Sequence, residues 1–150
     1  MPGWRSRRTT RYRETLEAAG TSVIGIPGAE DATFPGALRA AVDSGVTAVM
    51  AGDDPTAVSA LEVLATSGIL SPQAVSVTGF DGVGVYRSPL FGLATMRQPV
   101  EAMAIAATDI MMRRLDNTQT EPAHEVFRGE YVPGTTLGLL QAEHALNSSA

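Results

Sequence analysis

Apolar residues recur along the chain first with helical spacing and then in short continuous runs, and this order repeats several times. Helical spacing closed by a glycine predicts helices over residues 8–19, 35–45 and 54–68. A fourth helix is predicted from Pro99 to about Leu115, because its apolar residues share one face. Asp54 stands directly before a proline, which is the position of an N-cap for the third helix.

The segments between these helices are rich in β-branched residues, which is typical of strands. They predict strands over 21–26, 46–51 and 75–79, and a short strand over 93–96. The second run is almost continuously apolar, which predicts a strand buried on both faces of a parallel sheet. Residues 80–91 are predicted to form a loop. Further on, a polar connector over 117–122 precedes two short extended pieces, at 125–127 and 131–132.

This order of strands and helices predicts the α/β class, with a parallel sheet in a three-layer αβα arrangement. Ligands of such sheets bind at the carboxyl ends of the strands. Asp53 and Asp54 follow one predicted strand, and Asp81 follows another. We expect Asp54 to cap the helix and Asp53 to face a cleft. Asp81 either accepts a ligand's hydroxyl groups or forms an ordinary turn with Gly82, and Arg8 has the donors to bind the same ligand.

The composition is ordinary for one globular domain of 150 residues, with 44% hydrophobic residues, 18% charged residues and no cysteine. The lack of cysteine excludes disulfides and thiolate metal sites. No apolar run is long enough to span a membrane, and the first residues do not resemble a secretory signal. We therefore expect a cytoplasmic protein with no membrane partner.

The eleven basic residues are all arginine, and five of them lie within the first thirteen residues, which contain no acid. The rest of the chain holds all sixteen acidic residues and six arginines. An acidic body repels a phosphate backbone, so the chain is not expected to bind nucleic acid by itself. The basic start is either a solvated helix entrance or a contact for anions.

No motif predicts catalysis, a metal site or a cofactor. His124 and His144 lie beyond the predicted strand ends, and the sequence has neither a nucleophile elbow nor a metal-binding histidine pair. The glycines that follow the strand over 75–79 do not precede a helix, so they do not predict a phosphate-binding loop. A small α/β enzyme is a further hypothesis, in which Asp53 and Asp81 act as acid and base.

Three sequence blocks resemble one protein family when their order and spacing are taken together. They are DDPTAVSAL at 53–61, VSVTGFDG at 75–82, and Pro89-Leu90 followed by TMRQP at 95–99. The blocks resemble the effector-binding core of the lactose/galactose repressor family of bacterial transcription regulators. Weaker similarity extends over nearly the whole chain. The resemblance implies part of a type I subdomain like those of periplasmic binding proteins.

The resemblance also implies a function. Members of this family are homodimeric sensors that bind a small sugar or nucleobase effector and act on operator DNA through a helix-turn-helix domain. The family residues that match Arg8, Asp53 and Asp81 contact the effector, and the stretch from Phe80 supplies aromatic walls. No catalytic residue is implied. The alternative is a periplasmic sugar-binding protein of a transport system, which the block around Asp81 also fits.

The sequence departs from the family at three positions of note. Asp53 stands where the family usually has asparagine, so a hydrogen-bond donor is lost and a negative charge is added. Arg11 stands where glycine is usual, and Pro133 where arginine is frequent. The first departure predicts altered effector chemistry or weak binding.

The resemblance divides the chain into the C-terminal portion of an effector-binding and dimerisation core over 1–136 and a tail over 137–150. In the longer family chains, the helix that matches 99–115 packs on an N-terminal subdomain that these residues do not include. Four apolar residues of that helix would then lack their usual cover: Val100, Met103, Ile110 and Met111. Soluble monomers seldom expose an apolar patch of this size, so we expect self-association or an altered helix position.

Overall fold

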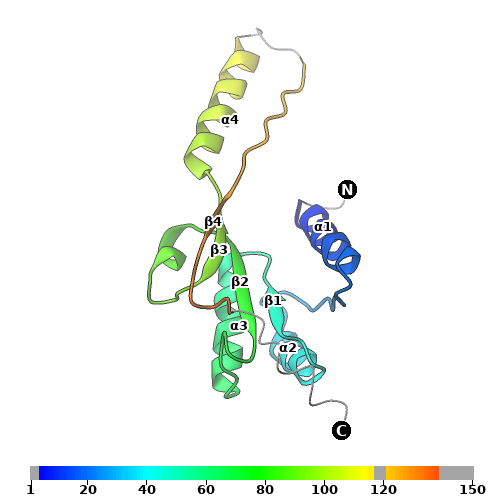
Figure 1. Cartoon of the computed structure of the whole chain (residues 1–150). Coiled ribbons are helices and arrows are strands. Elements are labelled where there is room, and N and C mark those ends of the chain that lie inside the picture. The colour runs from blue at the N-terminus through cyan, green and yellow to red at the C-terminus, as the bar shows by residue number, and fades with distance from the viewer. Residues whose placement is uncertain (1–3, 117–120, 139–150) are drawn as a thin grey trace.

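The computed structural model describes residues 4–116 and 121–138, and Figure 1 shows how its elements are arranged. The helices are α1 (Trp4–Ala18), α2 (Phe34–Asp43), α3 (Asp54–Thr66) and α4 (Val100–Leu115), with a short 3-10 helix η1 (Gly84–Arg87). The strands are β1 (Ala48–Met50), β2 (Ser76–Asp81), β3 (Ala94–Arg97) and β4 (Glu130–Val132). Part of the predicted connector, at 117–120, and the tail from 139 lie outside the described residues.

The four strands form one sheet in the order β1-β2-β3-β4. β1 pairs with β2 and β2 pairs with β3 in parallel, whereas β4 runs antiparallel to β3. The register places Met50 beside Thr78 and Asp81 beside Arg97, so the carboxyl ends of the parallel strands lie at one end of the sheet. The predicted α/β class with a mostly parallel sheet is confirmed.

The core lies between the sheet and the helices α2 and α3. Its buried apolar residues are Phe34, Leu38, Ala51, Ala57, Ala60, Leu64, Val75, Val77 and Leu93. Gly79 of β2 faces α3, because a Cβ at this position would meet Ala57. Successive residues of a strand point to opposite faces. Phe80 therefore lies on the face of the sheet that α3 does not cover.

The segment after β4 is tied to the same core by Thr136. Its buried hydroxyl accepts the backbone N–H of Ala94 at 3.0 Å and donates to the carbonyl of Val77 at 2.8 Å. Its own carbonyl accepts the N–H of Val77 at 2.7 Å. One side chain and its backbone thus connect the end of the described chain to β2 and β3.

One strand prediction fails because a strand needs a partner that local sequence does not reveal. Residues 21–26 form no strand, although their composition is typical of one. β propensity describes how well a residue fits a paired, pleated surface, and β1 is an edge strand that pairs with β2 alone. Of the two predicted extended pieces, 131–132 belongs to β4, whereas 125–127 pairs with no strand.

Two further predictions are corrected by the extent of the elements. β1 is three residues long and is not buried on both faces, since Met50 is 47% exposed. Met50 lies beside Thr78, on the face that α2 and α3 leave uncovered. The predicted loop over 80–91 begins too early, because Phe80 and Asp81 belong to β2, and it contains η1.

Helix α4 projects away from the sheet, and residues 121–129 return beside it to β4 (Figure 1). We call α4 together with residues 121–129 the arm. No residue of α4 is buried, and Met111 and Leu115 are 64% and 69% exposed. Of the four residues expected to lack cover, Ile110 is half-buried and the other three are exposed. None of the helices in the described part of the chain is long and apolar enough to cross a membrane.

Candidate functional site

Asp54 is a fully buried carboxylate at the start of α3 that joins three elements. Its Oδ2 accepts the backbone N–H of Gly82 at 2.7 Å, and its Oδ1 accepts the hydroxyl of Thr95 at 2.6 Å. A buried charge is stable only with such partners, and hydrogen bonds to a charged acceptor are the stronger ones. Because Gly82 follows β2 and Thr95 belongs to β3, Asp54 holds the ends of both strands against α3.

The sequence Gly79-Phe80-Asp81-Gly82 matches this arrangement residue by residue. A Cβ on Gly79 would overlap the Oδ1 of Asp54, so the absence of a side chain leaves room for the buried carboxylate. Gly82 provides the N–H that the same carboxylate accepts. The two residues between these glycines, Phe80 and Asp81, form the end of β2.

Asp53, and not Asp54, caps α3. Asp53 has an extended backbone, and its Oδ1 accepts the N–H of Thr56 at 2.9 Å. The prediction that Asp54 caps the helix is therefore wrong, because the cap is Asp53. The two residues are chemically identical neighbours. Contacts with Gly82 and Thr95, which lie far along the chain, select Asp54 for burial and leave the cap to Asp53.

Asp81 ends β2 in an unusual backbone conformation. Its φ is 116°, a region in which residues other than glycine are strained. Its Oδ1 accepts the side-chain amide of Gln98, and its backbone oxygen accepts the N–H of Gln98 at 2.9 Å. Strained backbone of this kind is concentrated at functional sites. One residue, Gln98, thus holds this strained position through both the side chain and the backbone of Asp81.

Arg8 of α1 extends over the ends of β1 and β2. Its guanidinium carbon lies 3.8 Å from the centre of the Phe80 ring, a cation–π contact, and its Nη2 donates to the carbonyl of Gly52. Gly52 directly precedes Asp53, and Phe80 directly precedes Asp81. One guanidinium group thus contacts the neighbours of both acidic residues.

The structure gathers Arg8, Asp53, Phe80 and Asp81 at one end of the sheet, but neither of two hollows in the described part of the chain is lined by all four. A hollow of about 630 Å³ lies between this end and the arm. Phe80 lines it, whereas the three charged residues do not. This hollow is therefore not the predicted cleft shared by Asp53 and Asp81.

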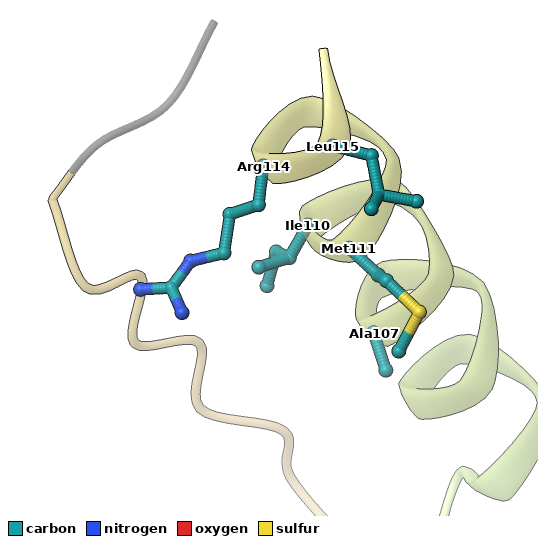
Figure 2. Close-up of a pocket in the computed structure, with 5 residues that line it drawn as sticks. All are labelled: Ala107, Ile110, Met111, Arg114 and Leu115. Carbon is teal, nitrogen blue, oxygen red and sulfur yellow. The ribbon is translucent and has the colours of Figure 1, made fainter. Parts of the chain in front are cut away.

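A second hollow, of about 510 Å³, lies on the outer half of α4. It is lined by Ala107, Ile110, Met111, Arg114 and Leu115. Figure 2 shows Arg114 extending toward the returning segment of the arm, while Met111 and Leu115 point away from that segment. Apart from one guanidinium the wall is apolar, so this hollow suits an apolar surface and not a ligand rich in hydroxyl groups.

Sequence reasoning missed the roles of Asp54 and Gln98. Nothing near Asp54 in the sequence shows whether its carboxylate is buried between the strand ends or caps the helix. Gln98 lies seventeen residues after Asp81. In the sequence, only its place in the block TMRQP indicated that it has a role. Both roles depend on strand pairing that brings distant residues together.

The chemistry of the gathered residues suits a neutral ligand with many hydroxyl groups. Carboxylates accept hydrogen bonds from hydroxyl groups, and a guanidinium donates to hydroxyl or ring oxygens. An aromatic ring adds a flat apolar surface. Within residues 4–116 and 121–138, no three acidic or histidine side chains lie together as ligands for a metal ion.

The mostly parallel sheet, its flanking helices and the acidic residues at its strand ends define an α/β domain of the ligand-binding class. The family described as the periplasmic binding protein-like domain matches residues 2–137. A likeness to solved structures supports the same fold: a LacI transcriptional regulator from a Rhodococcus species superposes with a TM-score of 0.76 over 87% of this chain and 50% of that chain, at 24% identity.

Similar proteins bear the names of transcription regulators. CelR of Thermobifida fusca is 31% identical over 125 residues, which are 79% of this chain and 37% of CelR. GalS of Salmonella typhimurium is 38% identical over 68 residues, which are 45% of this chain and 20% of GalS. A solved CelR–cellobiose complex is 26% identical with a TM-score of 0.70, over 86% of this chain and 41% of that chain. The chain therefore belongs to the periplasmic binding protein-like family, as part of an effector-binding domain of the LacI type.

The chain spans only part of its relatives. It covers between 20% and 37% of the length of the curated regulators that it matches. It covers about half of the matched LacI-type structures, for example 52% of a regulator from Sanguibacter keddieii.

Proposed function

We propose that this chain is the C-terminal part of the sensing core of a LacI-type regulator and that it binds a small sugar-like effector. The binding residues in this proposal are Arg8, Asp53, Phe80 and Asp81. The observation that carries it is the position of Arg8, which contacts the Phe80 ring and the carbonyl of Gly52. One donor group thereby lies next to both acidic strand ends.

Each residue has a role that its chemistry supports. Asp81 accepts ligand hydroxyl groups in addition to the Gln98 amide, since a carboxylate has about four lone-pair sites. Phe80 packs on the apolar face of a sugar ring, and Arg8 donates to ring or hydroxyl oxygens. Asp53 contributes less, because its Oδ1 already accepts the N–H that it caps.

Two observations favour a sugar over other ligands: the solved complex of one relative, and the negative charge of the carboxylates at the site. The solved CelR structure is a complex with cellobiose. Two carboxylates close to the site disfavour a phosphorylated ligand through like-charge repulsion. Neutral hydroxyl groups avoid that cost and donate hydrogen bonds to both carboxylates.

In the whole protein, the core regulates transcription and carries out no catalysis. We propose that it acts in the cytoplasm on operator DNA through a helix-turn-helix domain that is not among these residues. The acidic body of the chain opposes direct contact with phosphates. The effector then acts by shifting a conformational equilibrium and does not touch the DNA.

The arm supports a role in assembly. Val100, Met111 and Leu115 are 51%, 64% and 69% exposed, and soluble monomers seldom keep such a continuous apolar face. We propose that α4 packs on an N-terminal subdomain in the longer protein. Copies of the 150-residue chain associate through the same face to form a homodimer.

Calorimetric titration of the protein with cellobiose, galactose and glucose tests the effector site. We expect weak, saturable binding of at least one sugar, and its loss in Asp81→Ala. Asp43→Ala is the matched control, because Asp43 is an exposed carboxylate at the end of α2. Unchanged binding in Asp81→Ala removes Asp81 from the site, and no binding of any sugar removes the sugar-like effector.

A further inference from the structure

The arm joins the sheet through two adjacent crossings of the chain. One is Arg97-Gln98, between β3 and α4, and the other is Gly129-Glu130, where β4 begins. Arg97 and Glu130 are partners in the strand register, and their Nη1 and Oε2 atoms lie 3.4 Å apart as an ion pair. We call these four residues the neck. A change in the angle between arm and sheet must alter the backbone here.

The neck is closely packed against the end of β2. A Cβ on Gly129 would lie 2.9 Å from the Cγ of Met96 and 3.0 Å from the carbonyl oxygen of Arg97. From the other side, a Cβ on Gly82 would lie 2.8 Å from the Cα of Arg97. The residue that follows Asp81 and the second crossing of the neck therefore both pack on Arg97.

Gln98 connects this neck directly to the candidate effector site. Its side-chain amide donates to the Oδ1 of Asp81, and its backbone N–H donates to the carbonyl of Asp81 at 2.9 Å. The N–H of Val100, the first residue of α4, bonds to the carbonyl of Gln98 at 3.0 Å. A short chain of hydrogen bonds thus runs from the Asp81 carboxylate to the start of the arm.

We propose that Gln98 is a positioning residue that orients the Asp81 carboxylate for the effector and couples effector binding to the angle of the arm. This inference rests on the proposed function of Asp81. The side-chain bond fixes the rotamer of the carboxylate, which leaves its other lone pairs for ligand hydroxyl groups. The backbone bond holds the neck to the same residue.

Coupling between two such events is reciprocal. If the Gln98 contact strengthens effector binding, then the bound effector strengthens the Gln98 contact by the same factor. The free protein then samples a wider range of arm angles than the effector-bound protein does. Loss of the Gln98 amide weakens binding and also removes the effect of the ligand on the arm.

The chain has no cysteine, so two introduced cysteines can be spin-labelled without background. Thr108→Cys on α4 and Glu62→Cys on α3 are exposed positions that report the distance between the arm and the sheet layer. The distance distribution is measured by pulsed electron paramagnetic resonance, without ligand and with cellobiose. Labelled chains are mixed with an excess of unlabelled chains, so that the proposed homodimer adds no distances between copies. Hydrogen exchange of the amide at position 98 is measured in parallel.

Three variants separate a donor role from packing. Gln98→Ala removes the side chain, and Gln98→Glu keeps its size but replaces the donating amide with an acceptor that faces the Asp81 carboxylate. Gln73→Ala is the control, since Gln73 is an exposed glutamine.

Without ligand, both substitutions of Gln98 should widen the distance distribution. They should also speed exchange at position 98 by about fivefold, the effect expected for one hydrogen bond. Exchange at Val77, near the start of β2, should stay unchanged in both variants. The Gln73→Ala protein should match the wild type in both measurements. With cellobiose, the distribution should narrow in the wild type only, and the affinity should fall about fivefold in both Gln98 variants.

The ligand-free comparison decides the inference on its own. If Gln98→Glu behaves like the wild type, packing and not the donated hydrogen bond explains the data, and the inference is overturned. If exchange at Val77 accelerates as much as exchange at position 98, a general loss of stability explains the data, and the inference is likewise overturned. If wild-type protein fails to bind cellobiose, that ligand is removed from the proposed function. An unchanged arm in a Gln98 variant overturns the positioning role whether or not the sugar binds.

Discussion

The most informative pair of substitutions compares two adjacent aspartates that the structure gives different roles. Asp54 is fully buried and accepts two hydrogen bonds, whereas Asp53 is half-buried and caps α3. Replacing each with alanine removes the same chemical group from neighbouring positions. The difference in the free energy of unfolding between the two variants therefore measures the difference in role.

The magnitudes follow from the partners that each substitution leaves behind. Asp54→Ala strands the N–H of Gly82 and the hydroxyl of Thr95 in the interior. Each unsatisfied buried group costs about 1–3 kcal/mol, so the expected loss is about 3–5 kcal/mol. Asp53→Ala loses a helix cap, which costs about 1 kcal/mol. Because whole domains are stable by about 5–15 kcal/mol, only the first change threatens the fold.

Urea denaturation followed by circular dichroism measures both effects. With a slope of about 1.5 kcal/mol per molar urea, Asp54→Ala should lower the midpoint by about 2–3 M and Asp53→Ala by about 0.7 M. If Asp54→Ala does not fold, asparagine variants give the same ranking. Asp53→Asn keeps the cap and should be neutral, while Asp54→Asn should cost about 1 kcal/mol. Equal losses at the two positions would refute the assignment of roles.

Three further predictions concern backbone strain, packing and assembly. Asp81→Gly should be more stable than Asp81→Ala by about 1 kcal/mol in urea denaturation, because glycine relieves the strain at a φ of 116°; equal stability would contradict that strain. Gly79→Ala should cost about 2 kcal/mol, because its Cβ overlaps a buried carboxylate, whereas Gly36→Ala, in open space, should not destabilise the protein; similar midpoints for the two would argue against the packing. Met111→Glu should convert the dimer to a monomer in sedimentation velocity, and a wild-type protein that is already monomeric would sink the proposed association.

The helices could be predicted from sequence because their signals are local. Gly45 and Gly68 follow α2 and α3 with positive φ, as expected for residues that end helices, and the apolar spacing of α4 gave its range closely. Strands depend on partners elsewhere in the chain. Residues 21–26 have the composition of a strand but form none, and the exposure of Met50 could not be known without the position of the helices.

The candidate site was predicted to the level of the strand ends and no further. A general rule about parallel sheets indicated Asp53 and Asp81, and the sheet register does place their strand ends together. The rule could not show which neighbouring aspartate is buried, because Gly82 and Thr95 decide it from a distance. It also could not indicate Gln98, whose contact with Asp81 arises where β3 leads into α4.

Backbone amide mapping by nuclear magnetic resonance tests the ligand site most directly and tolerates weak affinity. The isotope-labelled protein is titrated with cellobiose, and the shifts of individual N–H signals are followed. Saturable shifts should centre on Gly52, Asp53, Phe80 and Asp81, at the ends of β1 and β2, and should vanish in Asp81→Ala. Shifts confined to α4, or none at any of these four amides with any sugar, would contradict a sugar-binding site at this end of the sheet.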